Sequence, residues 1–178
     1  PFCGSMAVLF AKDRCSTEIA NDAYGLVTNL ARVIQDDVLG LQLFGRVART
    51  QLNEAIYAEA DQRCPADIPD GCQPALDCAY RFLIRSWQGT NDLTGTDIQD
   101  PAWRKRFTAS GGSDGSKWDA VIRSVPGWWL RLRSVQVFNG CGFDLLERVA
   151  TDQEFAIYAD PPYIDEGDVY VHGWKPSP

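Results

Sequence analysis

The sequence lacks several features that would indicate a particular class of protein. Its one histidine, His172, is distant from Cys64, Cys72 and Cys78, and the spacing of these cysteines fits no standard zinc pattern. No apolar run is long enough to cross a bilayer. No positively charged start is followed by a short apolar stretch, so no secretory signal is visible. We therefore expect no bound metal, no membrane partner and a cytoplasmic location.

The chain also has too many core-forming residues for a disulfide scaffold. Hydrophobic residues make up 45% of its 178 residues, so the six cysteines are expected to be reduced thiols. The 23% of charged residues and the 11% of aromatic residues exclude a disordered or collagen-like chain. The net charge of −7 disfavours indiscriminate binding to polyanions but leaves a local basic surface possible. The length fits one α/β domain with an insertion.

Helical and strand patterns alternate near both ends of the chain. We expect a loop at residues 1–5 that opens into a helix, a strand at 17–22, and a helix at 23–37 whose Leu26, Leu30, Val33 and Ile34 form one apolar face. The alternation returns with a strand at 135–138, a helix at 144–151 and a strand at 154–159. This order is typical of a parallel α/β sheet, although a strand should also precede the first loop.

The middle of the chain interrupts this alternation. Residues 41–60 and 74–87 are predicted to be helical, and the glycine- and serine-rich residues 108–116 are predicted to form an exposed loop. We therefore assign residues 1–40 and 134–178 to a partial catalytic core, and residues 41–133 to a mostly helical insertion.

Three segments are expected to meet at the carboxyl ends of the strands, where open α/β sheets bind ligands. They are residues 1–5, the pair Asn21 and Asp22, and residues 160–163. Gly4 would let a ligand approach the backbone closely. An acid after the second strand commonly binds a ribose diol, but Asp22 could equally be the N-cap of the helix that follows.

The segment Asp160-Pro161-Pro162-Tyr163 is the most specific pattern in the chain. Two prolines after a buried strand fix the backbone and remove two amide donors, so an acid and an aromatic ring are fixed in one rigid turn. A structural turn with a solvated acid is the alternative interpretation.

With Pro-Phe-Cys-Gly-Ser at 1–5 and Ile-Ala-Asn-Asp at 19–22, this segment resembles the DNA adenine methylase (Dam, D12 class) family. The resemblance spans essentially the whole chain, and residues 81–89 are similar to part of the family's target-recognition insertion. It implies an incomplete Rossmann-like sheet of an S-adenosylmethionine-dependent methyltransferase, truncated at both ends. We expect a chain of this extent to be poorly stable and inactive, because unpaired central strands expose the sheet.

The resemblance implies methyl transfer from S-adenosylmethionine to the exocyclic amine of an adenine flipped out of DNA. The Asp160 carboxylate and the Pro161 carbonyl would each accept one amine N–H, which favours the tetrahedral nitrogen of the transition state. Pro162 would keep the turn rigid, and Tyr163 would stack on the flipped base. The residues implied to contact the cofactor are Pro1, Phe2, Cys3, Gly4, Ser5, Asp22, Cys141 and Asp144.

The chain departs from the family pattern at two of these places. Cys141 replaces an acid that commonly reads the cofactor's adenine, and Met6 replaces a frequent glycine. Asp144 could supply the missing acid or could cap the following helix. The Phe2 ring could lie near the cationic sulfonium or could belong to the core.

Contacts with double-stranded DNA are expected from the insertion. Residues 101–135 contain seven basic and two acidic residues, a net charge of +5, which leaves −12 for the remainder of the chain. A solvated helix face is the alternative interpretation of this charge, and the core is the alternative location for Trp103, Trp118, Trp128 and Trp129. The residues expected to contact nucleic acid are Arg81, Arg85, Arg104, Lys105, Arg106 and Lys117.

Other functions remain open. The same turn could present its acceptors to a cytosine amine, to RNA or to a glutamine amide, although the basic insertion argues against a protein substrate. The chain could also be a catalytically silent module that binds nucleic acid or another partner. For the leading interpretation we expect a monomer in a bacterial or phage-infected cell, in the setting of restriction and modification.

Overall fold

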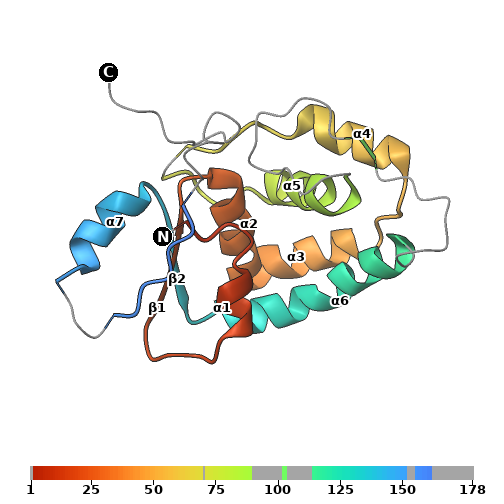
Figure 1. Cartoon of the computed structure of the whole chain (residues 1–178). Helices are drawn as coiled ribbons and strands as arrows, with labels where there is room; N and C mark the ends of the chain where they lie inside the picture. Colours follow the sequence, from red (N-terminus) through yellow and green to blue (C-terminus); the bar gives the residue numbers. More distant parts are fainter. Residues whose placement is uncertain (1, 70, 90–101, 104–113, 152–154, 162–178) are drawn as a thin grey trace, which may run out of the picture.

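The computed structural model describes residues 2–69, 71–89, 102–103, 114–151 and 155–161. Within them the chain forms seven helices and two strands (Figure 1). In chain order these are α1 (Ala7–Ala11), β1 (Glu18–Asp22), α2 (Gly25–Gln35), α3 (Asp37–Val47), α4 (Glu54–Arg63), α5 (Leu76–Gln88), α6 (Asp114–Leu132), β2 (Val135–Asn139) and α7 (Gly142–Val149).

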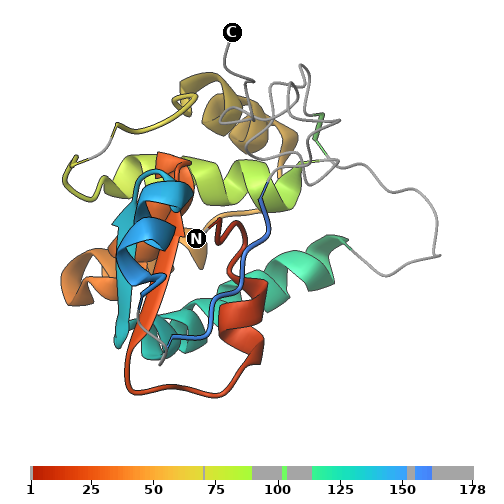
Figure 2. The same cartoon turned by 60° about the vertical axis from the view of Figure 1, so that its left-hand side comes forward.

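The two strands form a parallel sheet although they are far apart in the sequence. Glu18 pairs with Val135 at one end, and Asp22 pairs with Asn139 at the other. The connection between them contains α2 to α6, as expected because parallel strands need a long crossover. Figures 1 and 2 show the sheet between α7 and the other helices. The prediction of a mixed α/β fold with a parallel sheet is therefore confirmed.

One apolar core unites residues from both predicted parts of the chain. Ala20 and Val135 of the sheet, Leu83 of α5 and Trp118 of α6 belong to the same buried cluster. On α2, Val33 and Ile34 are buried in this cluster, as the predicted apolar face requires. The insertion therefore packs directly against the helix that covers the sheet, and the two predicted parts share their core.

The start of α2 is capped by a residue from another segment. The Gly25 N–H donates to Asp67 Oδ1 over 2.7 Å, and the N-cap residue, Tyr24, makes no side-chain capping bond. A Cβ atom at position 25 would lie 1.9 Å from the carbonyl oxygen of Ile68, so only glycine fits there. The segment after α4 therefore packs tightly against the first turn of α2.

Residues 41–60, predicted to be one helical region, contain the end of α3 and the start of α4 with a break between them. Thr50 lies in this break, where its Oγ1 lies 2.9 Å from the Tyr80 hydroxyl and its carbonyl oxygen accepts the Trp118 indole N–H over 2.9 Å. Asn53 then caps α4, because its side chain accepts the Ala55 N–H over 2.8 Å. Contacts with α5 and α6 thus fix the break.

Three predicted elements differ from the structure. The strand predicted at 154–159 is wrong for its described part, because residues 155–161 form neither helix nor strand and are exposed. The exposed loop predicted at 108–116 is wrong for Asp114, Gly115 and Ser116, which are the first turn of α6. The helix predicted from 144 begins earlier, at Gly142. Among the described residues, no helix is long and apolar enough to cross a membrane.

Candidate functional site at the carboxyl end of the sheet

The loop at the start of the chain lies against the carboxyl end of β1. The Cys3 N–H donates to the Asn21 carbonyl over 2.9 Å, and the Gly4 N–H donates to Asp22 Oδ2 over 2.7 Å. Burial raises the pKa of the Cys3 thiol, so this thiol stays protonated and is a poor nucleophile. The structure therefore brings together two of the predicted segments, residues 2–5 and the pair Asn21 and Asp22. Pro1 lies outside the described residues.

Asp22 is not the N-cap of α2, because that helix begins at Gly25. Its Oδ1 instead accepts the Tyr24 N–H over 2.9 Å, a local turn, while Oδ2 accepts from Gly4. Each carboxylate oxygen has a second lone pair, so Asp22 can still accept hydrogen bonds from a ligand. The carboxylate is half-buried and fixed in orientation.

The carboxyl ends of the two strands are tied to each other by asparagine side chains. The Asn21 amide donates to the Gly140 carbonyl over 2.9 Å, and the Asn139 amide donates to the carbonyls of Asp22 and Ala23 over 3.0 and 3.1 Å. Asn21 is buried; the sequence placed it with Asp22 at the ligand-binding edge but did not predict its amide bond to Gly140. These bonds fix both loops relative to each other.

Cys141 and Asp144 lie where β2 passes into α7. Cys141 is the N-cap residue of α7, is exposed and makes no side-chain capping bond. Asp144 is exposed in the first turn of that helix, so it complements the helix dipole without capping it. Both side chains are accessible at the predicted end of the sheet.

Two phenylalanine rings meet beside these loops. Phe2 and Phe143 pack edge to face, with 5.5 Å between ring centroids, and a Cβ atom at position 142 would lie 2.7 Å from the Phe2 ring. Phe2 and Met6 both have positive φ values, 56° and 57°. A left-handed conformation favours glycine, so the backbone at Met6 would suit glycine better than methionine. The loop carries this strain while the Met6 side chain is buried in the core.

The segment that carries Asp160 passes the same loop. Figures 1 and 2 both show residues 155–161 beside the segment that precedes α1. Asp160 and Pro161 are exposed there. Pro162 and Tyr163 lie outside the described residues. The first half of the predicted turn is therefore exposed, at the end of a segment that passes the loop before α1.

The predicted nucleic-acid contacts divide into three groups. Arg81 is buried and its Nε lies 2.6 Å from Asp77, and Arg85 Nε lies 2.6 Å from Asp61, so either would have to leave an acid to bind phosphate. Lys117 is exposed on α6. Arg104, Lys105 and Arg106 lie outside the described residues.

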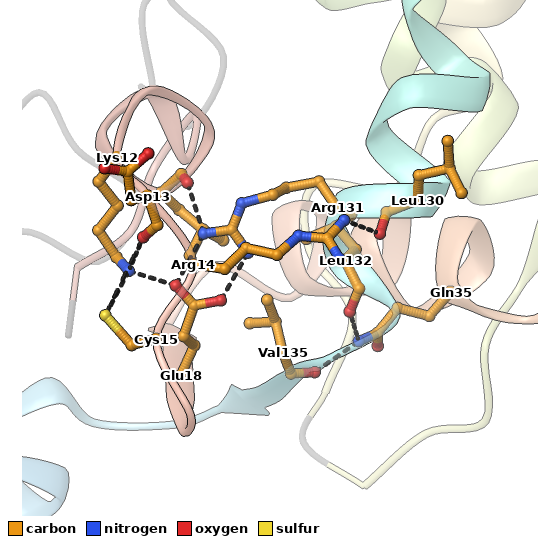
Figure 3. Close-up of polar contacts among 11 residues, drawn as sticks. Lys12, Asp13, Arg14, Cys15, Glu18, Gln35, Leu130, Arg131, Leu132 and Val135 are labelled. Carbon is orange, nitrogen blue, oxygen red and sulfur yellow. Dashed lines mark hydrogen bonds and ion pairs between the residues drawn. The ribbon is translucent and has the colours of Figure 1, made fainter.

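Among the described basic residues of 101–135, Arg131 does not contribute a surface charge. Arg131 is buried and donates to both carboxylate oxygens of Glu18 over 2.6 and 2.8 Å, and its other contact is the Leu9 carbonyl at 2.8 Å. Figure 3 shows the Arg131 guanidinium pointing toward Glu18, which also contacts Lys12. The surface charge of residues 101–135 is therefore lower than the sequence total.

The tryptophans occupy different environments. Trp118 is buried in the core, as the alternative interpretation held. Trp129 donates to Asp37 Oδ1 over 3.1 Å and has the Arg133 guanidinium 4.6 Å from its ring centroid. Trp103 and Trp128 are partly buried against the core.

Two other features of the described residues do not add to this site. No group of three or more histidine, cysteine or acidic side chains could bind a metal ion. A shallow depression on α3 contains none of the predicted site residues; it is lined by Leu41, Gln42, Gly45, Arg46 and Arg49. Comparison of the chain with family models, with curated proteins and with solved structures found no match.

Proposed function

We propose that the chain is the catalytic part of a DNA methyltransferase that modifies the exocyclic amine of adenine. The observation that supports this proposal is the bonding of the first loop to the carboxyl end of β1, with a third predicted segment passing beside that loop. The loop that contains Gly4 bonds to Asp22, and the segment that contains Asp160 passes that loop. The carboxyl end of a parallel sheet is where α/β enzymes bind their ligands.

The residues at the sheet end fit the cofactor that the resemblance implies. S-adenosylmethionine, when bound, would supply an electrophilic methyl group on a sulfonium. Asp22 retains free lone pairs for a ribose diol. Phe143 is 48% exposed beside Phe2, so an aromatic surface remains for the adenine or the sulfonium. Asp144 offers an accessible carboxylate three residues after Cys141.

The acceptor amine is activated by Asp160 and Pro161 in this proposal. An adenine amine is a weak nucleophile because its lone pair is delocalised into the ring. Two acceptors, the Asp160 carboxylate and the Pro161 carbonyl, would bind its two N–H groups and favour a tetrahedral nitrogen. Both residues are exposed and can reach a ligand. Cytosine amines would satisfy the same acceptors and are the closest alternative substrate.

A silent nucleic-acid-binding module is the second candidate. The Phe2 ring fills the space over Gly142, and Cys141 stands where an acid would read the cofactor. Both features would weaken cofactor binding while leaving the helices of the insertion unaffected.

The test is methylation of unmethylated DNA by the protein in its natural length with S-adenosylmethionine, followed by nucleoside mass spectrometry. Asp160→Ala is compared with Asp119→Ala, a matched exposed acid on α6. Methyladenine that disappears only with Asp160→Ala supports the proposal. Detection of methylcytosine instead would identify cytosine as the substrate. A folded protein that binds DNA but not the cofactor would support the silent module.

A further inference from the structure

The shallow depression on α3 has two arginines in its lining. The lining residues, which form what we call the α3 depression, are Leu41, Gln42, Gly45, Arg46 and Arg49. None of these side chains is acidic. Positions 42, 46 and 49 are four and three residues apart, so they share one face of the helix. The α3 depression therefore combines a concave shape with a positively charged lining.

The Arg46 side chain is fixed by two residues of α5. Its guanidinium carbon lies 3.6 Å from the centroid of the Tyr80 ring, and its Nη1 lies 2.9 Å from Asp77 Oδ1. The Tyr80 hydroxyl lies 2.9 Å from Thr50 Oγ1, so the ring is itself fixed in position. Arg46 remains 38% exposed and has further N–H donors besides the one that faces Asp77. A ligand would therefore bind an ordered guanidinium group at little cost in side-chain entropy.

Arg49 supplies a positive charge that no acid among the described residues neutralises. It lies in the turn after α3, where its N–H donates to the Arg46 carbonyl over 3.2 Å. Its side chain is exposed and forms no ion pair within the described part of the chain. Asp77 pairs with Arg81 as well as with Arg46, so one carboxylate is shared by two guanidinium groups. The α3 depression therefore keeps a net positive charge.

We propose that the α3 depression binds the phosphodiester backbone of the DNA substrate, with Arg46 and Arg49 donating to phosphate oxygens. The identity of the ligand rests on the proposed function. The side chains of Arg81 and Arg85, which the sequence indicated for this role, are only 11% and 24% exposed. Contacts to phosphate carry no sequence information, so the α3 depression adds affinity and fixes the orientation of the DNA without selecting its sequence.

A nucleic-acid backbone fits the α3 depression better than a small anion does. The volume of about 510 Å³ suits a group larger than an inorganic anion, and the lining comes from one helix and the turn after it. Two guanidinium groups one helical turn apart suit a polymer with repeated negative charges, whose binding is favoured by counterion release. Planar guanidinium groups also match the oxygens of a phosphate. An acidic peptide is the competing ligand, which the experiments below distinguish from DNA.

The first experiment changes the charge of the α3 depression at Gly45. A Cβ atom at this position would meet no heavy atom within 4 Å, so a longer side chain fits without disturbing the fold. Binding of the protein in its natural length to a fluorescein-labelled DNA duplex is measured by fluorescence anisotropy. Gly45→Glu should weaken binding about tenfold and Gly45→Lys should strengthen it, because only the added charge differs between them. The uncharged Gly45→Gln is the matched control, and equal affinities of the Glu and Lys variants overturn the proposal.

The second experiment removes the charge of Arg49 and follows the salt dependence of binding. Arg49→Gln should lower the affinity for every duplex sequence alike and reduce the slope of log affinity against log salt by about one. The control is Arg63→Gln, which removes an exposed arginine on α4 and should leave the slope unchanged. A folded Arg49→Gln protein with the unsubstituted slope overturns the proposal.

A third measurement uses the unsubstituted protein, so it does not depend on the folding of a variant. Phenylglyoxal modifies accessible guanidinium groups, and mass spectrometry locates them with and without a saturating DNA duplex. Protection of Arg49 but not of Arg63 by the duplex supports the proposal. Equal modification of Arg49 in the free and bound protein overturns it, as does stronger protection by a polyglutamate peptide, which would assign the α3 depression to an acidic protein partner.

The two proposals fail in different ways. Methylation of DNA without protection of Arg49 overturns the assignment of the α3 depression alone. Absence of any DNA binding by the folded protein overturns the proposed function as well.

Discussion

Arg131 and Glu18, 113 residues apart in the sequence, form a buried ion pair with two hydrogen bonds. The pair connects the end of α6 to the first residue of β1, and Arg131 also binds the carbonyl of Leu9 in α1. The insertion, the sheet and α1 are therefore joined by one guanidinium group (Figure 3).

Loss of one partner should strongly destabilise the chain. Arg131→Ala leaves the Glu18 carboxylate buried without its main partner, and we expect the free energy of unfolding to fall by about 3 kcal/mol or more. Urea unfolding measures this change. Arg133→Ala, which removes an exposed arginine two residues away, should change stability by less than about 1 kcal/mol. Equal effects of the two substitutions would contradict the importance of the buried pair.

The same pair should make stability depend on acid pH. Hydrogen bonds from Arg131 lower the pKa of Glu18 from 4.5 to about 2, against the effect of burial. Because the folded pKa is depressed, the stabilisation is complete above pH 4.5 and is lost as the pH falls toward 2. Acid unfolding followed by circular dichroism should therefore show a loss of stability across this range. In Glu18→Gln that part of the pH dependence should be absent.

Met6 allows two opposing effects to be compared. Met6→Gly would relieve a positive φ, worth about 1–2 kcal/mol. It would also remove a buried side chain, a loss of about 2–5 kcal/mol. The lost packing of the Met6 side chain should exceed the relieved backbone strain, so we expect a lower melting temperature in thermal unfolding. A more stable Met6→Gly chain would mean that the strain of the loop outweighs its packing.

Asp22 should matter for cofactor binding more than for folding. Asp22→Asn retains one oxygen that can accept from Gly4 or Tyr24 but lacks the second acceptor and the charge. We expect the affinity for S-adenosylmethionine, measured by calorimetry, to fall about tenfold, equivalent to loss of about one charged hydrogen bond. Asp13→Asn, an exposed acid outside the site, is the control. Unchanged affinity in a folded Asp22→Asn chain would remove Asp22 from the proposed site.

Local sequence patterns predicted much of the secondary structure. The spacing of apolar residues located α2, and short strand-like segments at 17–22 and 135–138 located β1 and β2. The junction of α3 and α4 was missed although Asn53, a good N-cap residue, marks the start of α4. The strand predicted at 154–159 illustrates the limit, since residues 155–159 have strand-like composition but form no ladder with a neighbour.

Hydrogen-bond and ion-pair partners that are distant in the chain could not be predicted from the sequence. Arg131 was counted as part of a basic surface because nothing near it in the chain indicates that Glu18 neutralises it. The same holds for Asp67, which caps α2 from a distant loop. At the candidate site, motif positions predicted the meeting of Gly4 with Asp22, but the bond from Asn21 to Gly140 depends on how the two strands align.

The cap at the start of α2 has a consequence for ligand chemistry. A free helix N-terminus attracts phosphate and carboxylate groups. In this chain the N-terminus of α2, close to Asp22, is already occupied. The Asp67 carboxylate accepts the Gly25 N–H, and the Ile68 carbonyl lies against Gly25. An anionic group of any molecule bound at the sheet end would be repelled there. A positive charge that pairs with such a group of the ligand must therefore come from another part of the protein.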